Sequence, residues 1–328
     1  MTDPAFSVVV LSYNSEVDLP GCLESLRRSL VPFGPTEVIL IDNGSSDGTV
    51  QIGRASSVVT RVVERRVNSG YAGGMNFGIS VASQDLVLIV TPDTRISEGA
   101  LTSLLTTACA CPKSAVVGCK FISGTTGKVD SEGGIILFPT GHAITNKRLS
   151  GDSGRIQVPY VEGALMMVRR PLFIGLGGFS EDLFSYYDEV DLCIRSWLRG
   201  LPVILDRRAE VVHFSKGSFG RHLELRAYLL NRNRILVTAS FSPRGFLLPF
   251  VLGELMVLTA TIVISPITSD GEHVRGHVRA LAWTLKNLRK IRERREKLGT
   301  AFDRRAYGGI VSKVGVAQYL KRLVNAHA

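Results

Sequence analysis

The alternation of continuous apolar runs with amphipathic segments is the feature that most constrains the fold. Residues 6–11 and 37–41 are apolar runs, and each is followed directly by polar turn residues. Such runs are typical of strands that are buried on both faces of a parallel sheet. Between the two runs, leucines recur at spacings that give a helix one apolar face, at Leu19, Leu23, Leu26 and Leu30. The pattern predicts a strand, a helix and a second strand.

The same order repeats up to about residue 120. Residues 62–64 and 86–90 are predicted strands, with a helix predicted over 74–82 between them. Ser97 can cap a further helix, which carries Leu101, Leu104 and Leu105. We therefore expect an α/β fold with an open, mostly parallel sheet of Rossmann type and helices on both faces. In such a fold, ligands gather beyond the carboxyl ends of the strands.

The rest of the chain divides into a loop-rich part, a regular part and an apolar, basic end. Residues 121–158 are rich in Gly, Ser and Thr and predict a loop-rich region. Regular patterns then predict strands at 164–169, 203–205 and 211–213 and helices at 188–199 and 223–240. We expect a catalytic domain over 1–240, with a nucleotide-binding half (1–120) and an acceptor-binding, catalytic half (121–240). A helical, membrane-associating region over 241–328 follows it.

Charge is concentrated in the carboxyl-terminal segment. The 328 residues carry a formal net charge of +10, and residues 269–328 contain 14 Lys or Arg against 5 Asp or Glu. An anionic partner is therefore expected at this end, whereas the body is close to neutral. The five cysteines include no CxxC pair, which fits neither a disulfide framework nor a zinc site. Because no signal-peptide pattern opens the chain, we expect the catalytic body to stay in the cytosol.

Two polar clusters that follow predicted strands suggest a nucleotide and metal site. The first begins at Asp42, whose carboxylate can accept from the imide N–H of uracil or thymine; an ordinary turn capped by Asp47 is the alternative. The second contains Asp93, and a hard cation that bridges two phosphates needs only one or two protein carboxylates. His213, at the end of a later strand, could complete the metal shell. A turn aspartate and a structural histidine are the alternatives here.

A third cluster places acids at the start of an amphipathic helix. Asp188, Glu189 and Asp191 lie within four residues, beside two tyrosines. A carboxylate there can serve as general base for an acceptor hydroxyl, although acids in a first helical turn are also favoured by the helix dipole. A glycine-rich segment, 68–76, precedes another predicted helix, where free N–H groups favour a diphosphate.

In order along the chain, these motifs resemble those of family 2 glycosyltransferases with a GT-A fold, and within that family the bacterial rhamnosyltransferase group. The resemblance covers about residues 6–240. It rests on 10–14, 41–49, 70–76, 91–94 and 187–195, together with Gly163-Ala164, 177–179, His213 and Arg232-Asn233. Two positions depart from the family pattern. Thr91 replaces the first Asp of the metal-binding DxD motif, and the Glu-Asp order of the base motif appears as Asp188-Glu189.

The resemblance implies a role for each matched residue. Glu189 takes the position of the base, with Asp188 and Asp191 beside it, and Asp93 and His213 would hold Mg²⁺ or Mn²⁺. The residues implied in binding the nucleotide sugar are Ser12, Tyr13, Asn14, Asp42, Asn43, Gly70, Gly73, Gly74, Asn76 and Asp93. Those implied in binding the acceptor are Gly163, Ala164, Arg232 and Asn233.

The implied activity is that of an inverting, metal-dependent hexosyltransferase in cell-envelope polysaccharide synthesis. The expected donor is a dTDP- or UDP-sugar, with dTDP-rhamnose first, and the expected acceptor is a membrane-linked glycan. Because Thr91 replaces a metal-binding acid, a catalytically inactive scaffold of the same fold is the alternative. A processive synthase is disfavoured because the QxxRW motif is absent. The sequence shows no nucleic-acid-binding motif, and it leaves a homo-oligomer open.

The end of the catalytic domain leads into a segment with membrane character. Residues 246–267 are apolar over 22 positions and long enough to cross a bilayer, but Glu254 argues against a simple span. Leu281, Leu285, Leu288 and Ile291 form an apolar stripe beside basic residues. This pattern favours a monotopic or re-entrant helix pair on anionic lipid, at the cytoplasmic face of the plasma membrane. The alternative is a region that packs on the catalytic domain and exposes a solvated charged face.

Overall fold

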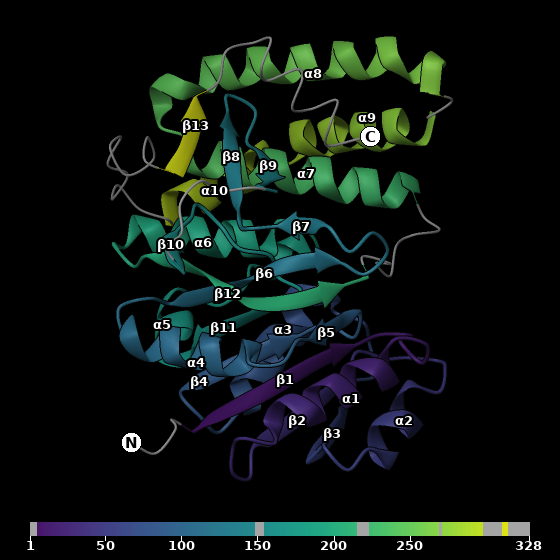
Figure 1. Ribbon diagram of the computed structural model, residues 1–328. Helices are drawn as coiled ribbons and strands as arrows, with labels where there is room; N and C mark the ends of the chain where they lie inside the picture. The colour runs from purple at the N-terminus through teal and green to yellow at the C-terminus, as the bar shows by residue number, and fades with distance from the viewer. Residues whose placement is uncertain (1–4, 148–153, 215–222, 269–270, 298–309, 314–328) are drawn as a thin grey trace. The chain divides into compact units, whose positions relative to one another are not determined.

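A computed structural model describes residues 5–147, 154–214, 223–268, 271–297 and 310–313 (Figure 1). Contacts divide the chain into two compact units, Met1–Gly134 with Thr145–Ser218, and Ile135–Ile144 with Phe219–Ala328. The second unit thus includes the helix at 223–241, most of which lies within the predicted catalytic domain. The functional boundary at residue 240 stays a prediction.

The first unit is built on a mixed sheet with the strand order β10-β12-β6-β11-β4-β1-β2-β3, to which β5 and β7 add at β12 and β6. The strands are β1 (Phe6–Ser12), β2 (Glu37–Asp42), β3 (Arg61–Glu64), β4 (Leu86–Val90), β5 (Thr94–Ile96), β6 (Val116–Ser123), β7 (Val129–Ser131), β10 (Arg155–Gln157), β11 (Leu165–Arg169) and β12 (Val203–His213). Strands β3, β2, β1 and β4 run parallel, and β11 runs antiparallel to both β4 and β6. Strand β6 therefore points the same way as β4. Strand β12 is parallel to β6 and points that way too.

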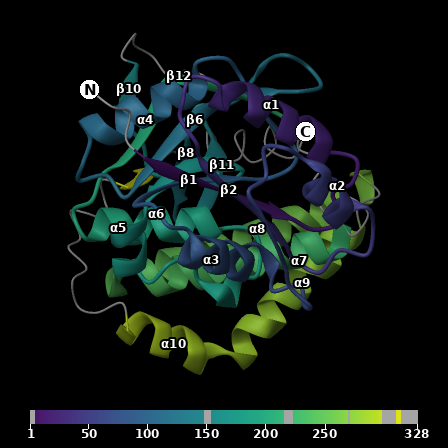
Figure 2. The ribbon, with the colours of Figure 1, turned by 90° about the horizontal axis from the view of Figure 1, so that it is seen from below.

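Helices cover both faces of this sheet, as predicted. They are α1 (Leu19–Leu30), α2 (Thr49–Ala55), α3 (Gly70–Val81), α4 (Ala100–Ala110), α5 (Arg170–Gly175) and α6 (Asp188–Leu198), with a short 3-10 helix η1 (Glu181–Leu183). Figure 2 shows α1 and α4 on one face and α3, α5 and α6 on the other. Every residue of β1 and β4 is buried between these layers, which explains why their sequences read as continuous apolar runs.

Several predicted boundaries are wrong. Helix α3 begins at Gly70 rather than at residue 74, and Gly99 rather than Ser97 stands at the N-cap of α4. Strand β12 is one strand instead of two, because the polar stretch from Asp206 to Glu210 continues the strand through a register shift. The region 121–158, predicted to be loop-rich, contains β7, β10 and two further strands, β8 (Gly134–Phe138) and β9 (His142–Thr145). These strands are three to five residues long, too short for a period to be recognised.

The second unit consists mainly of helices. They are α7 (Leu223–Phe241), η2 (Arg244–Phe246), α8 (Leu247–Thr268), α9 (Gly271–Lys286) and α10 (Leu288–Lys297). Helix α7 packs against α9 and α10, and α8 packs against α9. A small sheet has the order β13-β8-β9, with β13 at Val311–Lys313. The predicted stripe over 281–291 is wrong at one end, because Ile291 is buried whereas Leu285 and Leu288 are exposed. Within the described segments, none of the helices combines the length and the apolar character needed to cross a membrane.

Candidate active site

The directions of the strands bring distant residues to one edge of the sheet in the first unit. Strands β1, β2, β4, β6 and β12 all end at this edge, because they point the same way. Strand β11 is reversed, so the residues that precede it lie at the same edge. The backbone N–H of Thr91, after β4, donates to the carbonyl oxygen of Ala164, before β11, at 2.8 Å. Most of the predicted site residues therefore converge here.

Ser12 and Asp42 form one part of this edge. They are paired in register at the ends of β1 and β2, and both are buried. Oδ2 of Asp42 accepts from the backbone N–H groups of Gly44 (3.2 Å) and Ser45 (3.0 Å). Oδ1 of Asp42 and Oγ of Ser12 are buried and have no hydrogen-bond partner among the described residues. Because buried polar atoms are nearly always paired, two such neighbouring atoms suit a ligand that supplies hydrogen bonds.

Asn14, which follows Tyr13, joins the loops after β1 and β2. Asn14 has a left-handed backbone (φ 47°), and its N–H donates to Oγ of Ser45 at 2.8 Å. Its side-chain oxygen accepts from the backbone N–H of Ser46 at 2.8 Å. Tyr13 is half-buried beside it. The side chain of Asn14 is thus engaged in holding the loop after β2.

The glycine-rich segment packs as the start of α3, and it is not an open loop. Gly70 has a φ of +73°, and an added Cβ there would overlap the carbonyl oxygen of Phe184. Added Cβ atoms at Gly73 and Gly74 would press on the side chains of Ser69 and Leu11. These glycines therefore permit close packing, and no diphosphate contact is needed to explain them.

Two predicted sugar-binding amides also hold the backbone in place. The amide nitrogen of Asn43 donates to Oδ1 of Asn68 (2.9 Å) and to the carbonyl oxygen of Gly70 (3.0 Å). Oδ1 of Asn76 accepts from the backbone N–H of Phe179 (2.8 Å), and the amide nitrogen of Asn76 donates to the carbonyl oxygen of Phe179 (2.9 Å). Their hydrogen-bonding capacity is largely used within the protein.

Asp93 and His213 also meet at this edge. Nε2 of His213 lies 3.2 Å from Oδ2 of Asp93, and the pairing of β5 with β12 brings the two residues together. Oδ1 of Asp93 accepts from the hydroxyl of Thr91 at 2.6 Å. Burial alone would raise the pKa of Asp93, but the hydrogen bond and charge of His213 outweigh it and lower that pKa. Burial alone would lower the pKa of His213, and Asp93 raises it instead.

This pair fits part of a metal site. The described residues contain no group of three or more His, Cys, Asp or Glu side chains that could hold a metal ion. Asp93 and His213 offer one carboxylate and one imidazole, a donor set that suits a cation sharing its shell with diphosphate oxygens and water. Thr91, which stands in place of the first acid of the DxD motif, orients Asp93 by donating to it.

A strained turn brings acids to the start of α6. Phe184, Tyr186 and Tyr187 all have positive φ angles of 65° to 70°, a conformation that costs non-glycine residues about 1 kcal/mol or more each. Asp191 is fully buried and pairs with Arg195, whose Nη2 lies 2.6 Å from Oδ2. This salt bridge gives Asp191 a structural role.

Glu189, also at this helix start, has properties that suit proton transfer. Its side chain is half-buried, and burial followed by the charge of Glu162 raises the pKa of Glu189 to about 8. Asp188 beside it is almost completely buried. A carboxyl that titrates near neutral pH can accept a proton from an alcohol.

Gly163 lies against Glu189 and Tyr71. The hydroxyl of Tyr71 donates to the carbonyl oxygen of Gly163 at 2.6 Å. A Cβ added at Gly163 would lie 3.2 Å from that hydroxyl oxygen and 3.5 Å from Cβ of Glu189. The predicted acceptor residues Gly163 and Ala164 therefore lie beside Glu189 and Thr91 respectively.

Glu162 also lies at this candidate site, although we did not predict it from the sequence. Its Oε1 accepts from the hydroxyl of Ser131 at 3.2 Å, and burial raises the pKa of Glu162. Its charge acts on both Glu189 and His213. The signal for Glu162 in the sequence was its position immediately before Gly163-Ala164. Site residues were expected after strands, whereas Glu162 precedes strand β11.

Arg232 and Asn233 lie on α7 in the second unit. Nε of Arg232 donates to Oδ1 of Asn233 at 2.8 Å. The guanidinium of Arg232 stacks over the rings of Tyr228 and Trp283, with its carbon 5.6 and 5.5 Å from the ring centroids. Within this unit both residues take part in helix packing, and their role in acceptor binding stays a prediction.

Comparison with known proteins identifies a family and a relative to which this chain is similar. Residues 7–177 match the family model described as Glycosyl transferase family 2. The chain is 29% identical over 249 residues to the N-acetylglucosaminyl-diphospho-decaprenol L-rhamnosyltransferase of Mycobacterium tuberculosis. The aligned region covers 67% of this chain and 79% of that relative.

Two solved structures share the fold. GalNAc-T7, solved with UDP, GalNAc and Mn²⁺, matches with a TM-score of 0.59 and 14% identity over 74% of this chain and 48% of that chain. The mannosyltransferase PcManGT from Pyrobaculum calidifontis, solved with GDP-Man and Mn²⁺, matches with a TM-score of 0.55 and 17% identity over 86% and 75%. The sheet described above is therefore of GT-A type.

Proposed function

The chain belongs to glycosyl transferase family 2, and we propose that it transfers L-rhamnose from dTDP-rhamnose to a hydroxyl of a lipid-linked glycan, with inversion, in cell-envelope polysaccharide synthesis. Use of a nucleotide-sugar donor follows from the family. The choice of sugar and acceptor is supported by the name of the mycobacterial relative, at 29% identity. The observation that carries the proposal is the convergence of Asp42, Asp93 and Glu189 on one edge of one sheet.

The buried pair Ser12 and Asp42, at the ends of β1 and β2, would bind the nucleobase. A thymine or uracil ring carries one imide N–H flanked by carbonyl oxygens. Oδ1 of Asp42 can accept that N–H, and the hydroxyl of Ser12 can donate to a neighbouring carbonyl. A buried acceptor that is satisfied only when the base binds makes recognition specific, because a base without the N–H leaves it unpaired.

The diphosphate needs a cation in this environment. Asp93, Asp130 and Glu162 all act electrostatically on His213, so the site is rich in carboxylates. A diphosphate would be repelled unless Mg²⁺ or Mn²⁺ offset its charge. Asp93 and His213 are the residues that would hold the cation, which when bound stabilises the negative charge on the leaving diphosphate.

Glu189 would complete the reaction as general base. Its carboxylate takes the proton of the acceptor hydroxyl while that oxygen forms a bond to the anomeric carbon. The bond from the anomeric carbon to the diphosphate oxygen breaks, and the nucleoside diphosphate leaves with the electron pair. One displacement from the opposite face inverts the anomeric centre. The raised pKa of Glu189 suits this step, because a base with a pKa near the working pH is both available and strong enough.

The test is turnover of a panel of nucleotide sugars by purified protein, read as released nucleoside diphosphate. We expect dTDP-rhamnose to be turned over fastest with a lipid-linked acceptor present. Glu189→Gln should abolish release, whereas Asp85→Asn, an exposed acid before β4, should not change it. Full activity in both Glu189→Gln and Asp93→Ala would refute the proposal.

An inactive scaffold is the second candidate, and Thr91 is the observation that favours it. Calorimetry separates the two, since a scaffold without metal binding should bind dTDP or UDP equally with and without Mn²⁺. Nucleotide affinity that rises when Mn²⁺ is added would exclude the scaffold.

A further inference from the structure

Helix α8 has one face fixed inside the second unit. Phe250 and Val257 on this inner face are buried. At Gly253, an added Cβ would lie 2.8 Å from the side chain of Thr140 and 2.9 Å from that of Pro139. A larger residue at Gly253 would force Thr140 or Pro139 to shift, and this close approach sets which face of α8 turns inward.

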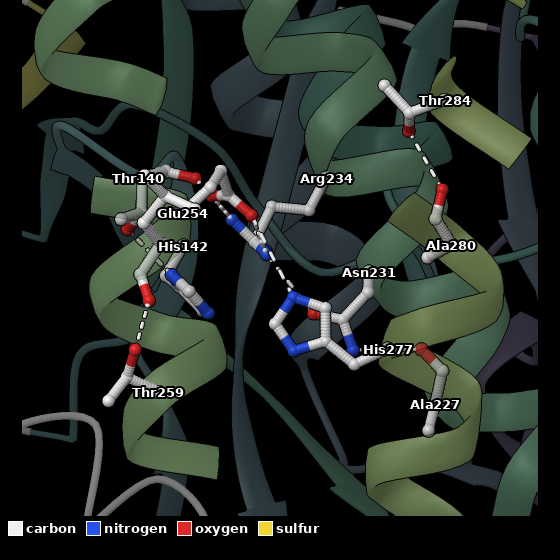
Figure 3. A network of polar contacts seen from close by, with 11 residues as sticks. Thr140, His142, Ala227, Asn231, Arg234, Glu254, Thr259, His277, Ala280 and Thr284 are labelled. Atoms are coloured by element: carbon white, nitrogen blue, oxygen red, sulfur yellow. Dashed lines mark hydrogen bonds and ion pairs between the residues drawn. The ribbon is translucent and has the colours of Figure 1, made fainter. Parts of the chain in front are cut away.

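Glu254, the single charged residue in the sequence of α8, belongs to that inner face. Nη2 of Arg234 donates to Oε2 of Glu254 at 2.8 Å, and Nη1 donates to Oε1 (Figure 3). The same guanidinium donates to the carbonyl oxygen of Thr140 (2.7 Å) and to Oδ1 of Asn231 (3.1 Å). Both Arg234 and Glu254 are buried, with only a few per cent of their surface exposed. The acid is thus paired inside the unit and does not reach the outer face.

His277 completes this buried network without adding a charge at neutral pH. Its Nε2 lies 4.0 Å from Oε2 of Glu254. Burial, followed by the charge of Arg234, lowers the pKa of His277 to about 4. The neutral imidazole leaves the Arg234–Glu254 pair balanced, as a buried ion pair requires.

Among the described side chains, the outer face of α8 is mainly apolar. The large side chains exposed along it, which we name the α8 stripe, are Leu248, Val251, Leu252, Leu255 and Ile262, with 50 to 68% of their surface accessible. Their spacings of three, one, three and seven residues place them in one row, about 21 Å long at 1.5 Å per residue. Thr259 lies in the same row, but its hydroxyl donates to the carbonyl oxygen of Leu255 at 2.9 Å. The hydroxyl is therefore already satisfied.

We infer that the α8 stripe is the surface with which this protein lies on an anionic lipid bilayer. The inference rests on the proposed function, since an enzyme whose acceptor is lipid-linked has to meet it at a membrane. An exposed apolar row of this length marks an interaction site. It offers no charge and no free hydrogen-bonding group by which a protein partner could be selected, whereas the boundary between headgroups and acyl chains demands neither.

Charge complementarity supports lipid as the occupant. Residues 219–328 contain 19 Lys or Arg against 7 Asp or Glu, a net charge of +12, and residues 135–144 contain none of either sign. The second unit therefore carries more than the whole net charge of the chain, which is +10. Each basic residue near an anionic surface adds to the attraction, so apolar insertion and electrostatic attraction act together.

Vesicle flotation of the full chain tests the inference. The protein is mixed with phosphatidylcholine vesicles that contain either no anionic lipid or about 30% phosphatidylglycerol. We expect it to float with the anionic vesicles. The double variant Leu252→Glu/Leu255→Glu should reduce the partition coefficient by about tenfold or more, because two charges would have to enter the interface. Leu252→Ala/Leu255→Ala, which removes only apolar area, should reduce it less.

Ile174→Glu is the matched control, because Ile174 is equally exposed (57%) but lies on α5 in the first unit. It should float like the wild type, and unchanged thermal unfolding should show that the variants are folded. Equal flotation of the Leu252→Glu/Leu255→Glu variant and the wild type would overturn the inference. So would a wild type that ignores vesicles and forms oligomers which this variant dissociates, because the stripe would then join copies of the chain. Vesicle binding without sugar transfer would contradict the proposed function alone.

Discussion

The hydroxyl of Tyr71 donates a 2.6 Å hydrogen bond to the carbonyl oxygen of Gly163. This contact joins the first turn of α3 to the segment before β11, and that segment in turn lies against Glu189 at the start of α6. Three segments that are far apart in the sequence are therefore held together at the proposed base.

Removing this hydroxyl should affect stability and activity together. Tyr71→Phe leaves the Gly163 carbonyl without its donor, and we expect a loss of about 1–3 kcal/mol in the free energy of unfolding. The turnover number should fall as well, because the segment beside Glu189 loses its anchor. Urea denaturation and steady-state kinetics measure the two effects. Tyr228→Phe is the control, since its ring packs on arginine and its hydroxyl makes no hydrogen bond within the described residues. Equal effects in both variants would contradict the prediction.

The pH dependence of transfer should report Glu189. Because the base must be deprotonated and burial with Glu162 raises the pKa of Glu189 to about 8, kcat/KM should rise with pH and level off above that value. Glu162→Gln removes a negative neighbour and should move the rise to lower pH. Tyr71, Tyr160 and Cys193 also sense the charge of Glu189, and their pKa values are raised, so they stay neutral in this range. An unshifted profile in Glu162→Gln would show that the two carboxyls are not coupled.

Two glycines with the same backbone angle should respond differently to alanine. Gly70 and Gly99 both have a φ of +73°, but a Cβ at Gly99 meets nothing within 4 Å, whereas one at Gly70 would overlap the carbonyl oxygen of Phe184. Gly99→Ala should cost about 1–2 kcal/mol for the left-handed backbone alone. Gly70→Ala should cost clearly more, and it should also reduce activity by displacing the turn before α6. Similar unfolding midpoints for the two variants would show that the Phe184 backbone yields.

Asp42 should govern nucleotide affinity. In Asp42→Asn, an amide nitrogen can replace the buried Oδ1 acceptor, and the imide N–H of the base then loses its partner. We expect the Kd for dTDP or UDP to rise about tenfold or more by calorimetry. Asp85→Asn, at the opposite end of β4, should bind as the wild type does. An unchanged Kd in Asp42→Asn would place the nucleobase elsewhere.

Removal of divalent cations should abolish transfer. Treatment with EDTA should stop release of nucleoside diphosphate, and added Mn²⁺ or Mg²⁺ should restore it. Asp93→Ala should lower the rate by about a hundredfold or more even at saturating Mn²⁺, because the proposed carboxylate ligand is gone. His213→Ala should be milder, and higher Mn²⁺ should partly rescue it. Full activity in EDTA would contradict the proposed role of the Asp93–His213 pair.

The sequence alone determined the parts of the fold that depend on short-range patterns. Buried strands such as β1 and β4 appear as continuous apolar runs, and the leucines of α1 recur on one helical face, so both could be predicted from local periodicity. The meeting of the polar residues after β2 and β4 at one edge could also be predicted, because the carboxyl ends of parallel strands lie at the same edge of a sheet. Short strands in 121–158 could not, since a strand of three residues shows no period.

Only the tertiary structure decided which polar groups are engaged and which are available. The reversed direction of β11 brings Glu162 to the candidate site, and Asp191 is engaged in a buried salt bridge with Arg195. Likewise, Glu254 is compatible with an apolar helix because Arg234, 20 residues away, pairs with it. The residue type determines whether a side chain can carry a charge. The free energy of burying that charge depends on neighbours that the fold supplies from distant parts of the sequence.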